Sequence, residues 1–139
     1  LDSQKKKVDF LDAVVDKLNL EGIETIHGRA EDIARERGYR EGFDLVVSRA
    51  VASLPVLLEY AMPFVRVGGT FIAYKGPNVY DEIKEAQNAM DLLGAEICDV
   101  KEVAVPYSDK THILLIIDKI TKIDNMYPRR AGKPKKTPL

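Results

Sequence analysis

Apolar side chains along this chain of 139 residues recur with a helical period in some segments and form continuous runs in others. From Val8 to Leu18 they return at steps of three and four residues, which predicts an amphipathic helix with Ser3 as its cap. A similar period ends at Gly94, and glycine often follows the last turn of a helix. The predicted helices cover residues 3–18, 31–37, 53–60 and 78–93.

The continuous apolar runs predict strands, because a strand that is buried on both faces needs no polar positions. The run Phe43–Ser48 is predicted to be a buried parallel strand, and Gly68 and Gly69 are predicted to turn the chain into the next strand. Only six residues, 106–111, separate the last two strands, which should therefore pair antiparallel. The predicted strands cover residues 23–27, 43–48, 70–74, 95–105 and 112–119.

Strands and helices thus alternate along the chain, which predicts an α/β fold with a mostly parallel, doubly wound sheet. The closing antiparallel hairpin is typical of the large Rossmann-like class of methyltransferases. The length suits one domain, which we expect to span residues 1–124. Ligands of such sheets bind beyond the carboxyl ends of the strands, so a site is expected in the loops that follow them.

The net charge of −1 hides a basic C-terminal segment. Residues 125–139 contain five Lys and Arg side chains and no acidic one, whereas residues 1–124 hold the other 16 basic and all 22 acidic side chains, a net charge of −6. The Pro and Gly residues of the segment predict an extended arm. A cationic arm favours a polyanionic partner, RNA or DNA first, although charge runs are also common as plain solvated surface.

Scarce cysteine and histidine exclude several kinds of site. A single cysteine, Cys98, rules out an internal disulfide framework and suits the reducing cytoplasm, and we expect it to be a buried strand residue. His27 and His112 are too few and too far apart for a zinc site and are expected to be packed or hydrogen-bonded. No apolar run reaches the roughly 18 residues of a membrane helix. We therefore expect neither a bound metal nor a membrane-spanning helix. We also expect the protein to be a monomer.

Polar residues follow four consecutive predicted strands at the edge where a ligand is expected. Asp2 and Ser3 precede the first helix, and Gly28-Arg-Ala-Glu31 follows the next strand. A carboxylate at such a position can accept hydrogen bonds from ribose hydroxyls, which is one interpretation of Asp2. The alternative is structural, with Asp2 and Ser3 as a helix cap and Glu31 as a first-turn acid that complements the helix dipole.

Two cations, Arg49 and Lys75, directly follow apolar strands. A cation at the end of a buried strand needs an anionic or carbonyl partner, which either a ligand or an internal ion pair can provide. The residues alone leave these two interpretations equally open. No Ser–His–Asp, Walker or nucleophile-elbow pattern occurs, so any chemistry rests on residues of this kind.

Six short motifs at these positions give the chain a specific resemblance to a known family. They are Leu1-Asp-Ser, Gly28-Arg-Ala-Glu31, Ser48-Arg-Ala-Val-Ala-Ser-Leu54, Val67-Gly-Gly69, Tyr74-Lys-Gly-Pro77 and Tyr127-Pro-Arg-Arg-Ala-Gly132. With this order and spacing, the chain resembles over its whole length the RsmG family, also called GidB, of bacterial 16S rRNA guanine-N7 methyltransferases.

The resemblance implies a class I fold, S-adenosylmethionine as cofactor, and 16S rRNA or the small ribosomal subunit as partner, with a guanine of the 530 loop as target. Asp2, beside Ser3, would hold the cofactor's ribose hydroxyls. Ala30 and Glu31 would frame its adenine. Arg49 would reach the cofactor or the entering base.

The resemblance also implies RNA contacts. Arg29 and Lys75 would contact RNA or the target guanine, which makes Lys75 a second catalytic residue beside Arg49. The basic segment would contribute phosphate contacts from Arg129, Arg130 and Lys133.

The family's glycine-rich cofactor loop and the strand before it lie upstream of Leu1. Without them the segment alone is expected to have unpaired sheet edges and to bind cofactor poorly. His112 stands where an arginine is expected in much of the family. The alternatives are a non-catalytic RNA-binding segment and a methyltransferase of the same fold with another substrate.

Overall fold

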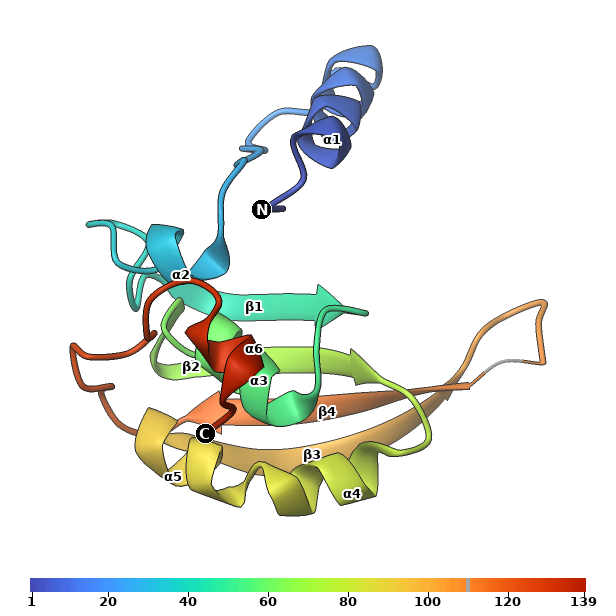
Figure 1. The fold of residues 1–139 in the computed structure, drawn as a ribbon. Coiled ribbons are helices and arrows are strands. Elements are labelled where there is room, and N and C mark those ends of the chain that lie inside the picture. The colour runs from blue at the N-terminus through green and yellow to red at the C-terminus, as the bar shows by residue number, and fades with distance from the viewer. Residues whose placement is uncertain (110) are drawn as a thin grey trace.

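The computed structural model describes residues 1–109 and 111–139 and has one sheet of four strands at its centre (Figure 1). The strands are β1 Phe43–Arg49, β2 Val65–Lys75, β3 Ala95–Ala104 and β4 Thr111–Lys119. Their order in the sheet is β1-β2-β4-β3. β1 and β2 are parallel, whereas β4 lies antiparallel to both β2 and β3. The predicted α/β sheet with a closing antiparallel hairpin is confirmed, but the sheet is not mostly parallel as predicted, since only the β1–β2 pair is parallel.

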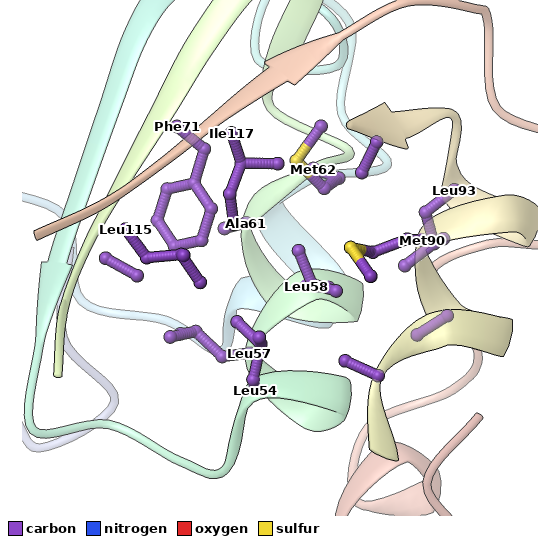
Figure 2. Packing of buried hydrophobic residues seen from close by; sticks show 14 of the residues in the cluster. Leu54, Leu57, Leu58, Ala61, Met62, Phe71, Met90, Leu93, Leu115 and Ile117 are labelled. Atoms are coloured by element: carbon purple, nitrogen blue, oxygen red, sulfur yellow. The ribbon is translucent and has the colours of Figure 1, made fainter. Parts of the chain in front are cut away.

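Three helices pack on one face of this sheet and enclose the core. They are α3 Leu54–Ala61, α4 Val79–Glu85 and α5 Gln87–Leu93. Phe71, Leu115 and Ile117 point from the strands toward α3, and Met90 and Leu93 approach it from α5 (Figure 2). Each fully buried side chain of this size contributes about 1.5–3 kcal/mol. α3 therefore lies at the centre of the core and fixes the position of the β1–α3 loop.

The prediction that β1 is buried is wrong. Leu45 and Val47 are 53% and 59% exposed. A strand is buried on both faces only where other elements cover both, and the face of β1 with Val46 packs against the core whereas the face with Leu45 and Val47 stays exposed. The apolar sequence of β1 therefore has one open face in this structure.

In the N-terminal part of the chain, α1 Lys5–Lys17 stands apart from the sheet, whereas α2 Ala30–Ile33 lies beside it and contacts α3 (Figure 1). α1 forms as predicted, but its N-cap is Gln4 rather than Ser3, and Val8 is its one buried residue. The predicted strand 23–27 is reduced to a single parallel bridge between His27 and Asp2. A strand needs a neighbouring segment to pair with along its length, and here only Asp2 pairs with it. The next predicted helix shortens to α2.

Three local predictions are wrong in the middle of the chain. Gly68 and Gly69 lie inside β2, where the register against β1 shifts, rather than in a turn before it. The predicted long helix is interrupted at Ala86, and nothing in the local sequence explains this break. Cys98 is exposed because a bulge between Ile97 and Asp99 takes it out of the ladder with β4.

The C-terminal segment folds back over α3 instead of extending as an arm (Figure 1). Ile123, Tyr127 and Pro134 are buried, and α6 Lys133–Lys136 forms a short helix near the end. The sequence suggested an extended arm because the segment is polar and rich in proline, but it is fixed by contacts with residues far away in the chain. No helix among the described residues is long and apolar enough to cross a membrane.

Gly94 offers a test of how α5 ends. It adopts a left-handed conformation with φ of +59°, and an added Cβ would meet the carbonyl oxygen of Thr121 at 2.8 Å. We expect Gly94→Ala to lower the free energy of unfolding by about 2 kcal/mol or more, because strain of about 1–2 kcal/mol adds to this clash. Urea denaturation measures the change. Gly22→Ala is the control, since Gly22 also has positive φ but has open space around it. Equal losses in the two variants would contradict the packing described here.

Candidate functional site

A cavity of about 690 Å³ lies between the edge of β1, α3 and the segments that surround α2. We call it the β1-edge cavity. It brings together all the residues for which the sequence predicted cofactor contacts, except Arg49. These are Asp2, Ser3, Ala30 and Glu31, and Arg29 also lines it. The predicted convergence of separate loops at one edge is therefore confirmed for these five residues, although their binding roles stay predictions.

Asp2 is held at the start of α1. Its Oδ1 accepts a hydrogen bond of 2.8 Å from the amide of Gln4, and its Oδ2 lies 3.6 Å from the ammonium of Lys7. The Gln4 hydrogen bond, helped by the charge of Lys7, holds the pKa of Asp2 below its usual value. Asp2 is therefore an ionised acceptor at neutral pH. The predicted helix cap by Asp2 and Ser3 is wrong, since Gln4 is the N-cap of α1 and no side chain caps it, and the Asp2 carboxylate lines the cavity.

Glu31 is buried beside the cavity and bonds to the C-terminal segment. Its Oε1 accepts a hydrogen bond of 2.9 Å from the amide of Gly132. Tyr60 of α3 also lines the cavity, and burial, together with the charge of Glu31, raises the pKa of the Tyr60 phenol. The carboxylate thus has one oxygen bonded to Gly132, and the contact joins residues 101 positions apart.

Ser48, at the carboxyl end of β1, carries an unsatisfied polar atom. Its buried Oγ has no hydrogen-bond partner among the described residues, and Ser48 lines the cavity. Buried hydroxyls without a partner are rare in folded proteins, because the lost hydrogen bond costs about 1–3 kcal/mol. Such an atom in a cavity wall suits contact with a ligand.

Arg49 lies outside the cavity lining but between Ser48 and Val51, which both belong to it. Its side chain is exposed, and no ion pair to it occurs within residues 1–109 and 111–139. Ala50 follows with φ of +55°, which turns the chain sharply away from the strand. Arg49 therefore remains available to a ligand, which is one of the two interpretations that the sequence left open.

Lys75 is not available, and its predicted role as a catalytic and RNA-contacting residue is corrected. Its ammonium is buried, lies 2.5 Å from a carboxylate oxygen of Glu82 and donates a 3.0 Å hydrogen bond to the Ala52 carbonyl. The same Glu82 oxygen accepts the amide of Leu54 at 2.6 Å. Lys75 thus forms an internal ion pair, which was one of the two interpretations that the sequence allowed. The pair also fixes the loop after Arg49.

Arg129 also has internal partners, which contradicts its predicted contact with RNA phosphate. Its guanidinium bonds both carboxylate oxygens of Glu59, with a shortest distance of 2.6 Å, and donates to the Thr137 carbonyl at 2.9 Å. Glu59 is fully buried, and the Arg129 side chain is 14% exposed. The hydrogen bonds to Glu59 raise the pKa of Arg129. Arg130 and Lys133, in contrast, are exposed.

Other charged residues that the sequence analysis did not select hold the same segment in place. Arg40 donates to the Tyr127 carbonyl at 2.7 Å, and Arg35 donates to the Met126 carbonyl at 3.1 Å. The buried ammonium of Lys119 lies 2.8 Å from Glu41, which also accepts the Ile123 amide. Burial lowers the pKa of Lys119.

One sequence signal could have revealed this docking. Glu59 is the only charged residue in the apolar stretch 54–64, and a carboxylate there needs a buried cationic partner. The identity of that partner could not be deduced, because it lies 70 positions away.

Each of the two histidines has a neighbouring group in the structure. His27 Nε2 lies 3.2 Å from the Ser3 carbonyl oxygen, and His112 packs edge-on against Tyr74, as expected of packed or hydrogen-bonded residues. The described part of the chain contains no group of three or more His, Cys, Asp or Glu side chains that could hold a metal ion.

Comparison with known proteins identifies the family. A family model described as rRNA small subunit methyltransferase G, GidB, matches residues 1–113. The chain belongs to this family. The predicted resemblance is therefore confirmed.

Members of the methyltransferase G family are similar to the chain along its whole length. The ribosomal RNA small subunit methyltransferases G of Alkaliphilus metalliredigens and Thermoanaerobacter sp. strain X514 are 49% and 52% identical over all 139 residues. The chain spans 58% of the length of each of these relatives. Their activity, substrate and partners therefore enter below as proposals.

Solved structures of other methyltransferases share the fold. A SAM-dependent O-methyltransferase from Thermotoga maritima aligns with a TM-score of 0.59 and 14% identity, over 88% of this chain and 49% of that one. TYW2 from M. jannaschii in complex with AdoMet aligns with a TM-score of 0.56 and 14% identity, over 81% and 53%. At this identity the likeness shows the fold alone, and it confirms the predicted Rossmann-like methyltransferase class.

The Glu59–Arg129 pair leads to a stability prediction. We expect Glu59→Gln to lower the free energy of unfolding by about 3 kcal/mol or more, because the Arg129 guanidinium is left largely buried without its counter-charge. Asp44→Asn is the matched control, since it breaks the Arg66–Asp44 pair, whose side chains are 50% and 83% exposed, and should cost at most about 1 kcal/mol. Urea denaturation gives both values.

A double variant, Glu59→Gln with Arg129→Gln, completes the thermodynamic cycle. It should lose clearly less stability than the sum of the two single variants, because neither charge is then left alone. Additive losses, or a loss for Glu59→Gln no larger than for Asp44→Asn, would contradict a docked ion pair.

Proposed function

We propose that this chain is the larger part of an S-adenosylmethionine-dependent methyltransferase that acts on small-subunit rRNA, with N7 of a guanine in the 530 loop of 16S rRNA as the acceptor. The observation that carries the proposal is the β1-edge cavity. In a chain of the methyltransferase G family, it gathers Asp2, Ser3, Ala30 and Glu31 from separate segments, and Ser48, whose buried hydroxyl is unsatisfied, belongs to the same lining.

The residues of the cavity suit the adenosine part of S-adenosylmethionine. The ionised carboxylate of Asp2 is an acceptor for ribose hydroxyls, and hydrogen bonds to a charged acceptor contribute about 1.5–3 kcal/mol. Glu31 and the backbone of Ala30 offer acceptors for the adenine amine. Apolar side chains such as Ile33 and Leu57 line the same cavity and suit the flat face of the base. The Ser48 hydroxyl can donate or accept a further hydrogen bond.

In the proposed reaction, the main task of the protein is to orient the cofactor and the target guanine. When bound, S-adenosylmethionine supplies a methyl group that its sulfonium already activates. Guanine N7 carries a free lone pair, so no side chain has to remove a proton before the attack. Holding two reactants in line is worth up to about 7–11 kcal/mol in well-oriented systems. The exposed Arg49, beside Ser48 at the cavity, is our candidate for the residue that orients the base or the cofactor.

Contacts to RNA are proposed for cations that have no internal partner. Arg29 is exposed at the wall of the β1-edge cavity, and Arg130 and Lys133 are exposed on the C-terminal segment. Arginine and lysine side chains on such surfaces neutralise phosphates and supply most of the affinity for RNA. Lys75 and Arg129 are excluded from this set because their charges are paired internally.

The proposal is tested by binding of S-adenosylmethionine in calorimetry. The experiment uses a fusion of this chain with the part of its Thermoanaerobacter relative that the chain does not cover, which we call the joined protein. We expect this joined protein to bind the cofactor, and Asp2→Ala to weaken binding at least about tenfold, because an ionised acceptor is lost. Asp9→Ala is the matched control, since Asp9 is an exposed acid of α1 that pairs with Lys5 outside the cavity.

One result would overturn the proposal as a whole, and another would overturn its assignment of Asp2. The first is an absence of cofactor binding by the joined protein, and if that protein still bound RNA, a non-catalytic RNA-binding role would replace the methyltransferase. The second is an equal loss of affinity in Asp2→Ala and Asp9→Ala, which would remove Asp2 from the cofactor site.

A further inference from the structure

A second cavity, of about 510 Å³, lies on the folded-back C-terminal segment. Nine residues line it, and none of them is acidic. Five carry a positive charge, and we call the site they form the basic cavity: Arg35, Arg129, Arg130, Lys133 and Lys136. Such a concentration of one charge in a hollow is unusual in a chain whose net charge is −1.

Most of this charge is not neutralised within the protein. Glu59 offsets only Arg129. Arg35 donates to backbone carbonyls, which leaves its charge unpaired, and no salt bridge reaches Arg130, Lys133 or Lys136 in the part of the chain that the structure describes. Four uncompensated cations therefore surround one hollow, and their mutual repulsion falls when an anion enters it.

The wall that carries these cations is fixed before any ligand arrives. Arg129 is clamped to Glu59, the Gly132 amide is bonded to Glu31, and Tyr127 is buried. A ligand then has to order only the ends of the exposed side chains and not the backbone between them. Such preorganisation raises affinity because less conformational entropy is lost on binding.

We propose that the basic cavity binds backbone phosphates of an RNA strand, an inference that rests on the proposed function and gives its RNA contact a location. Guanidinium groups present paired donors that match the oxygens of a phosphate. The cavity is larger than a single phosphate group, and the exposed Met126 in its lining offers an apolar surface to a ribose or a base. Met126 is the one large apolar side chain of the lining, so the cavity lacks the broad apolar face that binding to a membrane surface needs.

The basic cavity is connected to the β1-edge cavity by one hydrogen bond. Gly132 lines the former, and Glu31, which accepts the Gly132 amide, lines the latter. RNA held at the basic cavity would therefore lie against the same segment that borders the proposed cofactor site.

The test compares two triple variants of the full chain in binding to a fluorescent RNA stem-loop that contains the 530-loop sequence. The first, Arg130→Gln with Lys133→Gln and Lys136→Gln, removes three exposed cations of the basic cavity. The control, Lys17→Gln with Lys84→Gln and Lys101→Gln, removes the same charge from exposed positions outside it. Fluorescence anisotropy over a range of salt concentrations gives affinity and salt dependence, and circular dichroism checks that both variants fold.

We expect the cavity variant to bind at least about tenfold more weakly. Its slope of log K against log salt should be shallower by about 0.7 for each phosphate of a single strand that the variant no longer neutralises. The control should weaken binding less than about threefold, because it changes only the long-range field. Equal losses of affinity in the two variants, or an unchanged slope in the cavity variant, would overturn the inference.

Cofactor binding separates this inference from the proposed function. In the joined protein, the cavity variant should keep the affinity for S-adenosylmethionine, since none of its three residues lines the β1-edge cavity. RNA binding that depends on the basic cavity in a joined protein without cofactor binding would uphold the phosphate site and reject the methyltransferase. If the joined protein bound the cofactor but the cavity variant bound RNA as tightly as the unchanged protein, the methyltransferase would be upheld and the phosphate site rejected.

Discussion

The carboxylate of Glu59 lies on the central helix of the core, with no exposure to solvent, and the position of Arg129 and the residues after it depends on how its charge is satisfied. A buried carboxylate without a partner is too costly to persist in ionised form. The guanidinium of Arg129 supplies the counter-charge and bidentate hydrogen bonds to Glu59. The backbone amide of Arg129 also donates a hydrogen bond to Glu59 at 2.7 Å. This pair fixes a segment that the sequence alone presents as a solvated tail.

Docking of that segment produces both surfaces to which we assign function. With Arg129 turned inward, the neighbouring Arg130 is left outside, facing the basic cavity. Three residues after Arg129, the amide of Gly132 donates a hydrogen bond to Glu31 at the β1-edge cavity. The Lys75–Glu82 pair acts in a similar way at the N-terminal end of α3, where it holds the loop that follows Arg49. Two internal ion pairs thus position exposed arginines that are free to meet ligands.

The sequence predicted the parts of the fold that local patterns control. Helical period located α1 and α3, apolar runs located β1 and β2, and the short connection before β4 required an antiparallel hairpin. Predictions that depended on distant residues were wrong. Burial of β1 required an element over the face that carries Leu45 and Val47, and the bulge that exposes Cys98 has no signal in its residues.

For the candidate site, the sequence located residues but could not assign their partners. The loops around Asp2 and Glu31 do meet at one cavity, where a single parallel bridge pairs Asp2 with His27 just before α2. Arg49 and Lys75 occupy equivalent positions after their strands, yet only Lys75 has an acid, Glu82, within reach. The roles of Arg129 and Arg130 diverge for the same reason, since adjacent side chains point to different surroundings.

Hydrogen exchange of backbone amides, followed by NMR, tests the central claim that the C-terminal segment is a docked part of the site. The amides of Arg129 and Gly132 donate to buried carboxylates of Glu59 and Glu31, so the account predicts that they exchange slowly, comparably to amides of α3. Exchange of both at the rate of an unstructured chain, while α3 remains protected, would contradict the account and restore the interpretation of residues 125–139 as a free basic arm.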